Sequence, residues 1–355
     1  MQLRPFFFYF ALLLSLTAYS QATDSMKVAA VVEDYLATKG FSGTILVAQE
    51  GHAIYHRSFG LAYRATPDTI TNRYHYSIAS VTKLFTSIRI LQLVEEGKLT
   101  LNRPAGNYLP KFTALLDPAI TVGDLLRHTS GLPNEPEKTY LKPAHPADLV
   151  RQLLEKKKGK STQQFNYNNV DYLILGLIIE ALTGQSWREA ISTSILQPLG
   201  MDNTGFLEYG YYPANFAYPY QEKNGRLRQD PLFYIENFYA AGCMYSTTTD
   251  LLKLDQALYA DVLLSTKGRQ QLAISFPEYN YVGYGVWNYS YPFVSTQPTV
   301  MERRGGILGA NVVLVRLTDD NYTIIILSND DRFNPDSFGD ATNLREGLIR
   351  SLYSD

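Results

Sequence analysis

The first residues in this sequence that could carry out chemistry are a serine and a lysine three positions apart, Ser80 and Lys83. The residues around them have the apolar spacing of a helix that ends near Gly97: Val81, Leu84, Phe85, Ile88, Leu91 and Val94. Residues three apart on a helix share one face, with Cβ atoms about 5–6 Å apart, so the lysine amine can reach the serine hydroxyl. A desolvated lysine can take the proton of a serine and make it a nucleophile.

Three further stretches give this pair a context. Tyr167 and Asn169 lie two apart, just before an apolar segment with helical spacing. The second stretch is an Arg-Arg-Gly-Gly run that begins at Arg303, at the end of a predicted strand. The third is a His-Thr-Ser-Gly-Leu-Pro run that begins at His128.

Together these motifs resemble the serine β-lactamase and penicillin-binding-protein superfamily. The most similar branch is that of the class C β-lactamases, D-alanyl-D-alanine carboxypeptidases and related esterases. The family has Ser-x-x-Lys, Tyr-x-Asn and Lys-or-His-x-Gly in this chain order, and Ser-x-x-Lys carries the nucleophile of these enzymes. The resemblance runs from about residue 24 to the C-terminus and includes further matches: His128–Leu132, Pro198–Met201 and Ala241–Gly242.

The resemblance implies a role for each residue of the first two motifs. Ser80 would be the acylated nucleophile, and Lys83 would hold or accept its proton. Tyr167 would exchange protons with the serine and with the leaving group, because a nearby lysine charge lowers the pKa of a phenol. Asn169 would bond to Lys83 and to the substrate amide.

The resemblance also implies an oxyanion hole and a substrate-binding wall. The backbone N–H groups of Ser80 and Gly306 would form the oxyanion hole. Arg303 and Gly305 would bind substrate, with Arg303 in place of the usual lysine or histidine. An arginine keeps the positive charge and can hold a substrate carboxylate through two hydrogen bonds. The register leaves Arg304 as an alternative to Arg303.

Several other functions are not supported by the sequence. His128 invites a Ser-His triad, but the resemblance gives its motif a structural role, and the chain has no Gly-x-Ser-x-Gly elbow. His-Glu-x-x-His is absent, so we expect no metal and no cofactor. The formal net charge of −2 and the lack of a basic half indicate no nucleic-acid partner.

The order of hydrophobic patterns predicts an α+β fold. We expect one antiparallel sheet built from an N-terminal hairpin and C-terminal strands, flanked by terminal helices, with an all-helical insertion. The sheet would come from about 24–75 and 283–355, the insertion from about 99–243, and the whole catalytic domain from 23–355. The expected strands are 43–49, 52–59, 283–289, 299–303, 310–316 and 322–328.

The N-terminus has the features of a secretory signal peptide over 1–22: Arg4, a short apolar run, and small residues before Gln21 or Thr23. The protein is therefore expected to be periplasmic or secreted, with no membrane span after cleavage. Cys243 is the single cysteine, so no internal disulfide is expected.

The sequence thus predicts an exported serine hydrolase for amides or esters, with D-Ala-D-Ala peptides of peptidoglycan or β-lactams as candidate substrates. Two alternatives stay open: an esterase for small esters without useful β-lactamase activity, and a penicillin-binding protein that does not hydrolyse. The tyrosine-rich stretch 208–220 either lines a substrate groove or packs on the surface. The sequence leaves the natural substrate and the oligomeric state open.

Overall fold

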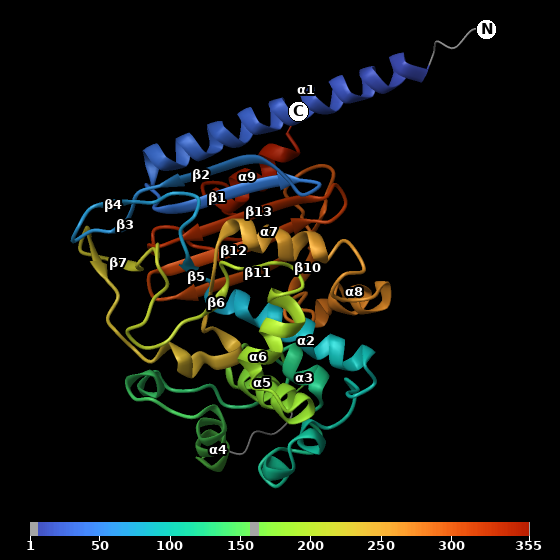
Figure 1. Cartoon of the computed structure of the whole chain (residues 1–355), viewed down its shortest axis with the longest axis vertical. Helices are drawn as coiled ribbons and strands as arrows, with labels where there is room; N and C mark the ends of the chain where they lie inside the picture. Colours follow the sequence, from blue (N-terminus) through green and yellow to red (C-terminus); the bar gives the residue numbers. More distant parts are fainter. Residues whose placement is uncertain (1–5, 157–162, 355) are drawn as a thin grey trace.

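The structure is a computed structural model that describes the backbone of residues 6–156 and 163–354, with side chains described from residue 21 onward within the first helix. That helix, α1, spans Phe6–Thr38 and lies across the top of the molecule (Figure 1). The predicted signal peptide, 1–22, falls almost wholly outside the residues whose side chains are described. Among the residues that the structure describes, no helix has the length and apolar character to cross a membrane.

The centre of the fold is a six-stranded antiparallel sheet with the order β10-β11-β12-β13-β1-β2. Its strands are β1 (Gly43–Gln49), β2 (His52–Phe59), β10 (Trp287–Ser290), β11 (Thr299–Ile307), β12 (Ala310–Leu317) and β13 (Tyr322–Ser328). The N-terminal hairpin joins the C-terminal strands through β1 and β13, with Gly43 opposite Ser328 and Gln49 opposite Tyr322. The predicted α+β class with this antiparallel sheet is confirmed.

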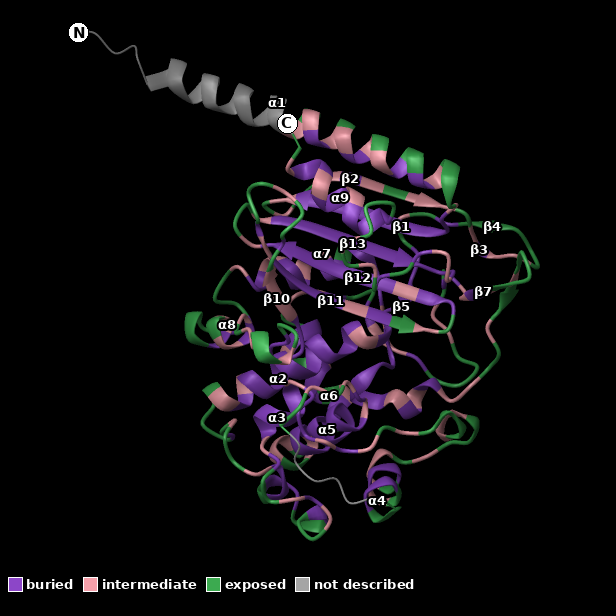
Figure 2. Ribbon diagram, turned by 180° about the vertical axis from the view of Figure 1, so that it is seen from behind, coloured by how far each residue is buried: buried purple, intermediate pink, exposed green. Residues whose placement is uncertain are grey.

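The two faces of the sheet belong to two hydrophobic cores. Successive side chains of a strand point to opposite faces, and β13 shows this directly. Ile324 and Ile326 pack in the core beneath α1 and α9 (Leu344–Leu352). Ile325 and Leu327 pack in the larger core, which includes α2 (Thr82–Glu95) and α5 (Val170–Thr183). The central strands β1, β12 and β13 are therefore buried on both sides, whereas the edge strand β2 is partly exposed (Figure 2).

The remaining helices lie mostly in the insertion, on the side of the sheet opposite α1 (Figure 1). The other α-helices are α3 (Val122–Leu126), α4 (Pro146–Lys156), α6 (Trp187–Ile191), α7 (Thr248–Ala257) and α8 (Thr266–Leu272). A π-helical turn, Ser192–Leu196, continues α6, and short 3₁₀ turns include η1 (Ala79–Val81) and η4 (Glu137–Leu141).

The insertion is not all-helical, which corrects that part of the prediction. It contains a hairpin of β7 (Tyr220–Lys223) and β8 (Arg226–Gln229), turned by Asn224 and Gly225, both with positive φ. Asn-Gly is the favoured pair for a two-residue hairpin turn, but the strands are too polar to stand out by alternation. The other short strands are β3 (Leu61–Tyr63), β4 (Asp68–Thr69), β5 (Tyr76–Ser77), β6 (Gly205–Phe206) and β9 (Met244–Ser246).

Candidate active site

Ser80 lies between the sheet and the helical insertion, in the 3₁₀ turn η1 that leads into α2. The sequence predicted a helix here, and the structure begins the α-helix two residues later, at Thr82. Ala79, directly before Ser80, is buried and has φ of 45°, a left-handed conformation that is uncommon for a residue with a side chain. Such strain costs about 1–3 kcal/mol and is typical of functional sites.

The side chain of Lys83 is fully buried beside the serine. Its Nζ donates hydrogen bonds to Ser80 Oγ at 3.0 Å, Asn169 Oδ1 at 2.7 Å and the carbonyl of Ala241 at 2.8 Å. Burial disfavours the charged amine and lowers the pKa of Lys83 to about 8. A lysine with this pKa can exchange protons near neutral pH.

Tyr167 approaches the same serine from the segment before α5. Its phenol donates to Ser80 Oγ at 2.8 Å and accepts from Arg303 Nη2 at 2.8 Å. Burial alone would raise the pKa of Tyr167, but the charges of Arg303 and Lys83 outweigh it and lower the pKa to about 8. Two groups able to take the serine proton therefore contact Ser80 Oγ.

The two arginines of β11 have different environments. Arg303 is 1% exposed, and its Nε donates to the carbonyl of Ser80 at 2.8 Å. Its guanidinium also lies over the Trp287 ring, 5.0 Å from the ring centroid. Arg304 lines the open cleft and pairs with Glu302 and with Asp336, at 3.1 Å for the latter. In the structure, the guanidinium of Arg303 is hydrogen-bonded to the Tyr167 hydroxyl. The binding of a substrate carboxylate by Arg303 stays a prediction.

The cleft in front of Ser80 has a volume of ≈ 300 Å³. Gly305 allows β11 to run close to the serine, because a Cβ added there would lie 2.6 Å from the Ile78 carbonyl and 3.0 Å from the Ser80 nitrogen. Gly306 follows on the same wall. The cleft is lined by Ser80, Phe165, Tyr167, Trp287, Arg304, Gly305, Gly306 and Asp336.

His128 lies behind Tyr167 and is fully buried. The two rings pack at a tilt with centroids 4.4 Å apart, and His128 Nδ1 lies 3.3 Å from Asp171 Oδ2. Burial holds the pKa of His128 well below its usual range and that of Asp171 well above. The histidine packs against the tyrosine and is not hydrogen-bonded to the serine, in line with the structural role expected from the sequence.

The structure adds one acidic residue that the sequence did not reveal. Glu135 Oε1 accepts a hydrogen bond from Asn169 Nδ2 at 2.7 Å, so Asn169 bridges Lys83 and Glu135. Glu135 follows the His128–Pro133 motif by two residues, and that proximity was the only available signal. Across the described residues, no group of three or more His, Cys, Asp or Glu side chains could hold a metal ion.

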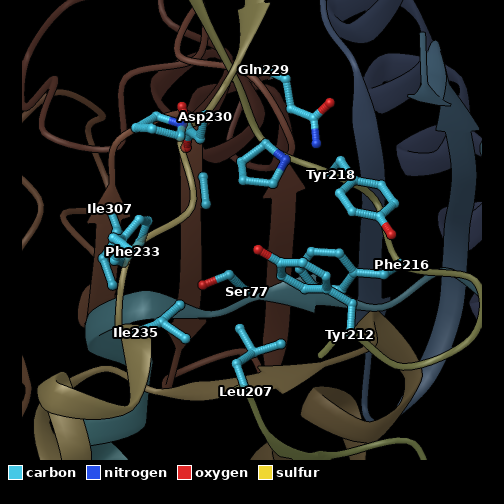
Figure 3. Close-up of a pocket in the computed structure, with 13 residues that line it drawn as sticks. Ser77, Leu207, Tyr212, Phe216, Tyr218, Gln229, Asp230, Phe233, Ile235 and Ile307 are labelled. Atoms are coloured by element: carbon cyan, nitrogen blue, oxygen red, sulfur yellow. The ribbon is translucent and has the colours of Figure 1, made fainter. Parts of the chain in front are cut away.

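Part of the tyrosine-rich stretch 208–220 packs against itself. Tyr212 stacks on Phe216 with ring centroids 4.8 Å apart, and Tyr218 meets Tyr212 edge-on at 5.1 Å. With Ser77 these rings surround a cavity of ≈ 20 Å³ (Figure 3). That volume holds about one water molecule, and Ser80 does not line it. The arrangement favours the packing interpretation over a substrate groove.

Comparison with known proteins decides the family. The β-lactamase family model matches residues 28–349. The chain belongs to the β-lactamase family. It is therefore a serine hydrolase by family, and the matched range includes all the site residues described above.

The chain is similar to penicillin-binding protein 4* of Bacillus subtilis. The two are 28% identical over 312 residues, which cover 81% of this chain and 68% of that protein. A teichoic acid D-alanine hydrolase of Staphylococcus aureus is 28% identical over 306 residues, 84% of this chain and 72% of that protein. The solved penicillin-binding protein of Bacillus halodurans is 26% identical, with a TM-score of 0.73, over 85% of this chain and 94% of that one.

Proposed function

We propose that this chain is an exported serine hydrolase that forms an acyl-enzyme at Ser80 and acts on amides or esters such as D-Ala-D-Ala peptides or β-lactams. The observation that carries the proposal is the pair of hydrogen bonds on Ser80 Oγ, from Lys83 Nζ at 3.0 Å and from Tyr167 at 2.8 Å. Both partners have a pKa of about 8, so either can hold the serine proton near neutral pH.

The proposed reaction has two halves. Ser80 Oγ attacks the substrate carbonyl and passes its proton to the Lys83–Tyr167 pair, while the N–H groups of Ser80 and Gly306 stabilise the negative oxygen. The pair returns the proton to the leaving alcohol or amine as the bond to it breaks, which leaves an ester on Ser80. Water then attacks this ester and gives a proton to the same pair. The pair passes that proton to Ser80 Oγ as the ester bond breaks, which releases the acid and restores the free serine.

An esterase without useful β-lactamase activity is the second candidate. The relative named teichoic acid D-alanine hydrolase favours it, since this relative aligns over 84% of the chain. A third outcome, slow acylation by penicillin without turnover, would make the protein a penicillin-binding protein that does not hydrolyse.

One experiment separates these candidates. The purified protein and its Ser80→Ala variant are incubated with a fluorescent penicillin, a chromogenic cephalosporin and a p-nitrophenyl ester. We expect acylation or turnover in the wild type and none in Ser80→Ala. Turnover of the ester alone supports the esterase, a stable penicillin adduct alone supports the binder, and unchanged turnover in Ser80→Ala removes Ser80 as the nucleophile.

Export and the domain limits belong to the same proposal: a signal peptide over 1–22 and a catalytic domain over 23–355. N-terminal sequencing of the protein recovered outside the cytoplasm tests both. A mature N-terminus at Gln21 or Thr23 is expected, and an intact Met1 in the exported fraction would contradict cleavage.

A further inference from the structure

Arg303 is a buried cation without an acidic partner. Its side chain is as deeply buried as that of Arg345, but Arg345 pairs with two carboxylates, those of Glu302 and Glu346. Among the described residues, no aspartate or glutamate forms an ion pair with Arg303. Burial of a charge without a counter-charge is costly. Another group must therefore stabilise the guanidinium of Arg303.

Two aromatic rings stand where a carboxylate would be expected. Arg303 Cζ lies 5.0 Å from the centroid of the Trp287 ring and 5.5 Å from that of the Tyr167 ring. The planes of the two rings differ by 26°, with centroids 6.3 Å apart. A cation within about 6 Å of an aromatic face is attracted to it, most strongly by tryptophan and when the pair is desolvated. The rings thus stabilise Arg303 together with its hydrogen bonds to the Ser80 carbonyl and the Tyr167 hydroxyl.

A ring differs from a carboxylate because it stabilises a cation without carrying a net charge. The positive charge of Arg303 is therefore not offset, and its Nη2 donates to the Tyr167 hydroxyl at 2.8 Å. Burial raises the pKa of Tyr167, but the charges of Arg303 and Lys83 outweigh burial and bring this pKa to about 8. A carboxylate in place of the Trp287 ring would cancel much of the effect of Arg303.

We infer that Trp287 is a positioning residue for the reaction, because its ring holds the Arg303 guanidinium against the Tyr167 hydroxyl. This inference rests on the proposed proton transfer between Ser80 and Tyr167. Trp287 begins β10, the edge strand of the sheet, where it pairs with Glu302 of β11. Its ring also lines the cleft in front of Ser80. A test must therefore separate an effect on Tyr167 from a contact with substrate.

The test is the pH dependence of kcat/KM for a neutral p-nitrophenyl ester between pH 6 and 10, with the full chain and its variants. Trp287→Leu removes the ring, and Trp287→Phe keeps an aromatic face. Phe165→Leu is the matched control, because Phe165 lines the same cleft but packs its ring against His128. When Arg303 is released from Tyr167, the pKa of the base rises, so the acidic limb moves to higher pH. For Trp287→Leu we expect an upward shift of about 0.5–1.5 pH units, which is about a 3- to 30-fold loss at pH 7. The shift should be smaller in Trp287→Phe, and the limb should stay in place in Phe165→Leu.

A double variant shows whether the ring acts through the arginine. In an Arg303→Gln protein, Trp287→Leu should shift the limb no further, because the ring then has no cation to hold. A second shift that adds to the first would mean that Trp287 affects Tyr167 without Arg303, and would overturn the inference. Circular dichroism and thermal melting confirm that each variant is folded, and Trp287→Met replaces Trp287→Leu if the latter does not fold.

The remaining outcomes separate this inference from the proposed function. An equal loss at every pH in Trp287→Leu, with the limb in place, would show that Trp287 only contacts substrate. Equal shifts in Trp287→Leu and Phe165→Leu would show a general disturbance of the cleft. Either result overturns the inference and leaves hydrolysis at Ser80 standing. A wild type that turns over no ester overturns the proposed ester hydrolysis together with the inference.

Discussion

Removal of the Arg303 charge is expected to move the pH dependence of the reaction upward. Arg303 Nη2 lies 2.8 Å from the Tyr167 oxygen. For two unit charges at this distance, Coulomb's law with an effective dielectric of about 20 gives an upper limit of about 6 kcal/mol for the interaction energy. At about 1.36 kcal/mol for each pKa unit, this energy corresponds to a pKa shift of at most about four units. Contacts of this kind lower a pKa by about 1–3 units, so Arg303→Gln should raise the pKa of Tyr167 from about 8 to between about 9 and 11.

The sign of the effect follows from the protonation state that the base needs. A base must be deprotonated to accept the serine proton, so kcat/KM falls about tenfold for each pH unit below its pKa. Arg303→Gln should therefore lose about 10- to 1000-fold at pH 7 and regain activity at higher pH. The Arg303 charge also lowers the pKa of Lys83, so the shift is upward whichever group is the base.

The assay is kcat/KM for a neutral p-nitrophenyl ester between pH 6 and 10, corrected for spontaneous hydrolysis. Arg304→Gln is the matched control, because it removes the same charge from the neighbouring residue, which pairs with Glu302 and Asp336 instead of Tyr167. An acidic limb that stays in place in a folded Arg303→Gln protein would refute the assignment of the low pKa to the Arg303 contact.

Three other substitutions test separate parts of the structure. Tyr167→Phe should lower kcat by about 10²- to 10⁴-fold, measured on the same ester, because proton transfer loses one of its two carriers; full activity would leave Lys83 as the sole base. Gly305→Ala should abolish most turnover, since the new Cβ would meet the Ile78 carbonyl at 2.6 Å and push β11 away from Ser80; wild-type kinetics would argue against that close approach. Glu302→Gln should reduce the free energy of unfolding by about 1–3 kcal/mol in urea, because it removes one of the two buried carboxylates that pair with Arg345 and leaves only Glu346. Burial opposes the charge of Glu302, but Arg345 and Arg304 hold its pKa below normal, so this stabilisation should be present above about pH 4–5 and be lost as the pH falls further.

The sheet was predictable because its strands have strong local signals. Gly43–Gln49 and Tyr322–Ser328 have the same bounds in the structure as in the prediction, since both are short, apolar and rich in branched residues. The strand expected at 283–289 begins only at Trp287, because Gly283 and Gly285 form a tight turn before it, with φ of 87° at Gly285.

The site was predictable to the extent that it depends on motifs. Ser80, Lys83, Tyr167 and Asn169 come together as the resemblance implies. Strand alternation separates Arg303 from Arg304 but does not reveal which of them faces Ser80. The presence of Glu135 beside Asn169 could not be predicted from the sequence either. Its contact with Asn169 joins residues 34 positions apart, and it depends on how the loops of the insertion pack.

The pairing of β1 with β13 has a consequence for how the chain folds. Gly43 meets Ser328, so the middle of the sheet joins segments from opposite ends of the chain. Topologies dominated by such distant contacts fold slowly, because a long loop must close before the contacts form. The sheet can be completed only after almost the whole polypeptide has been synthesised. Until then the apolar edge of the β1–β2 hairpin stays unpaired, and a truncated chain that ends before β13 should aggregate rather than fold.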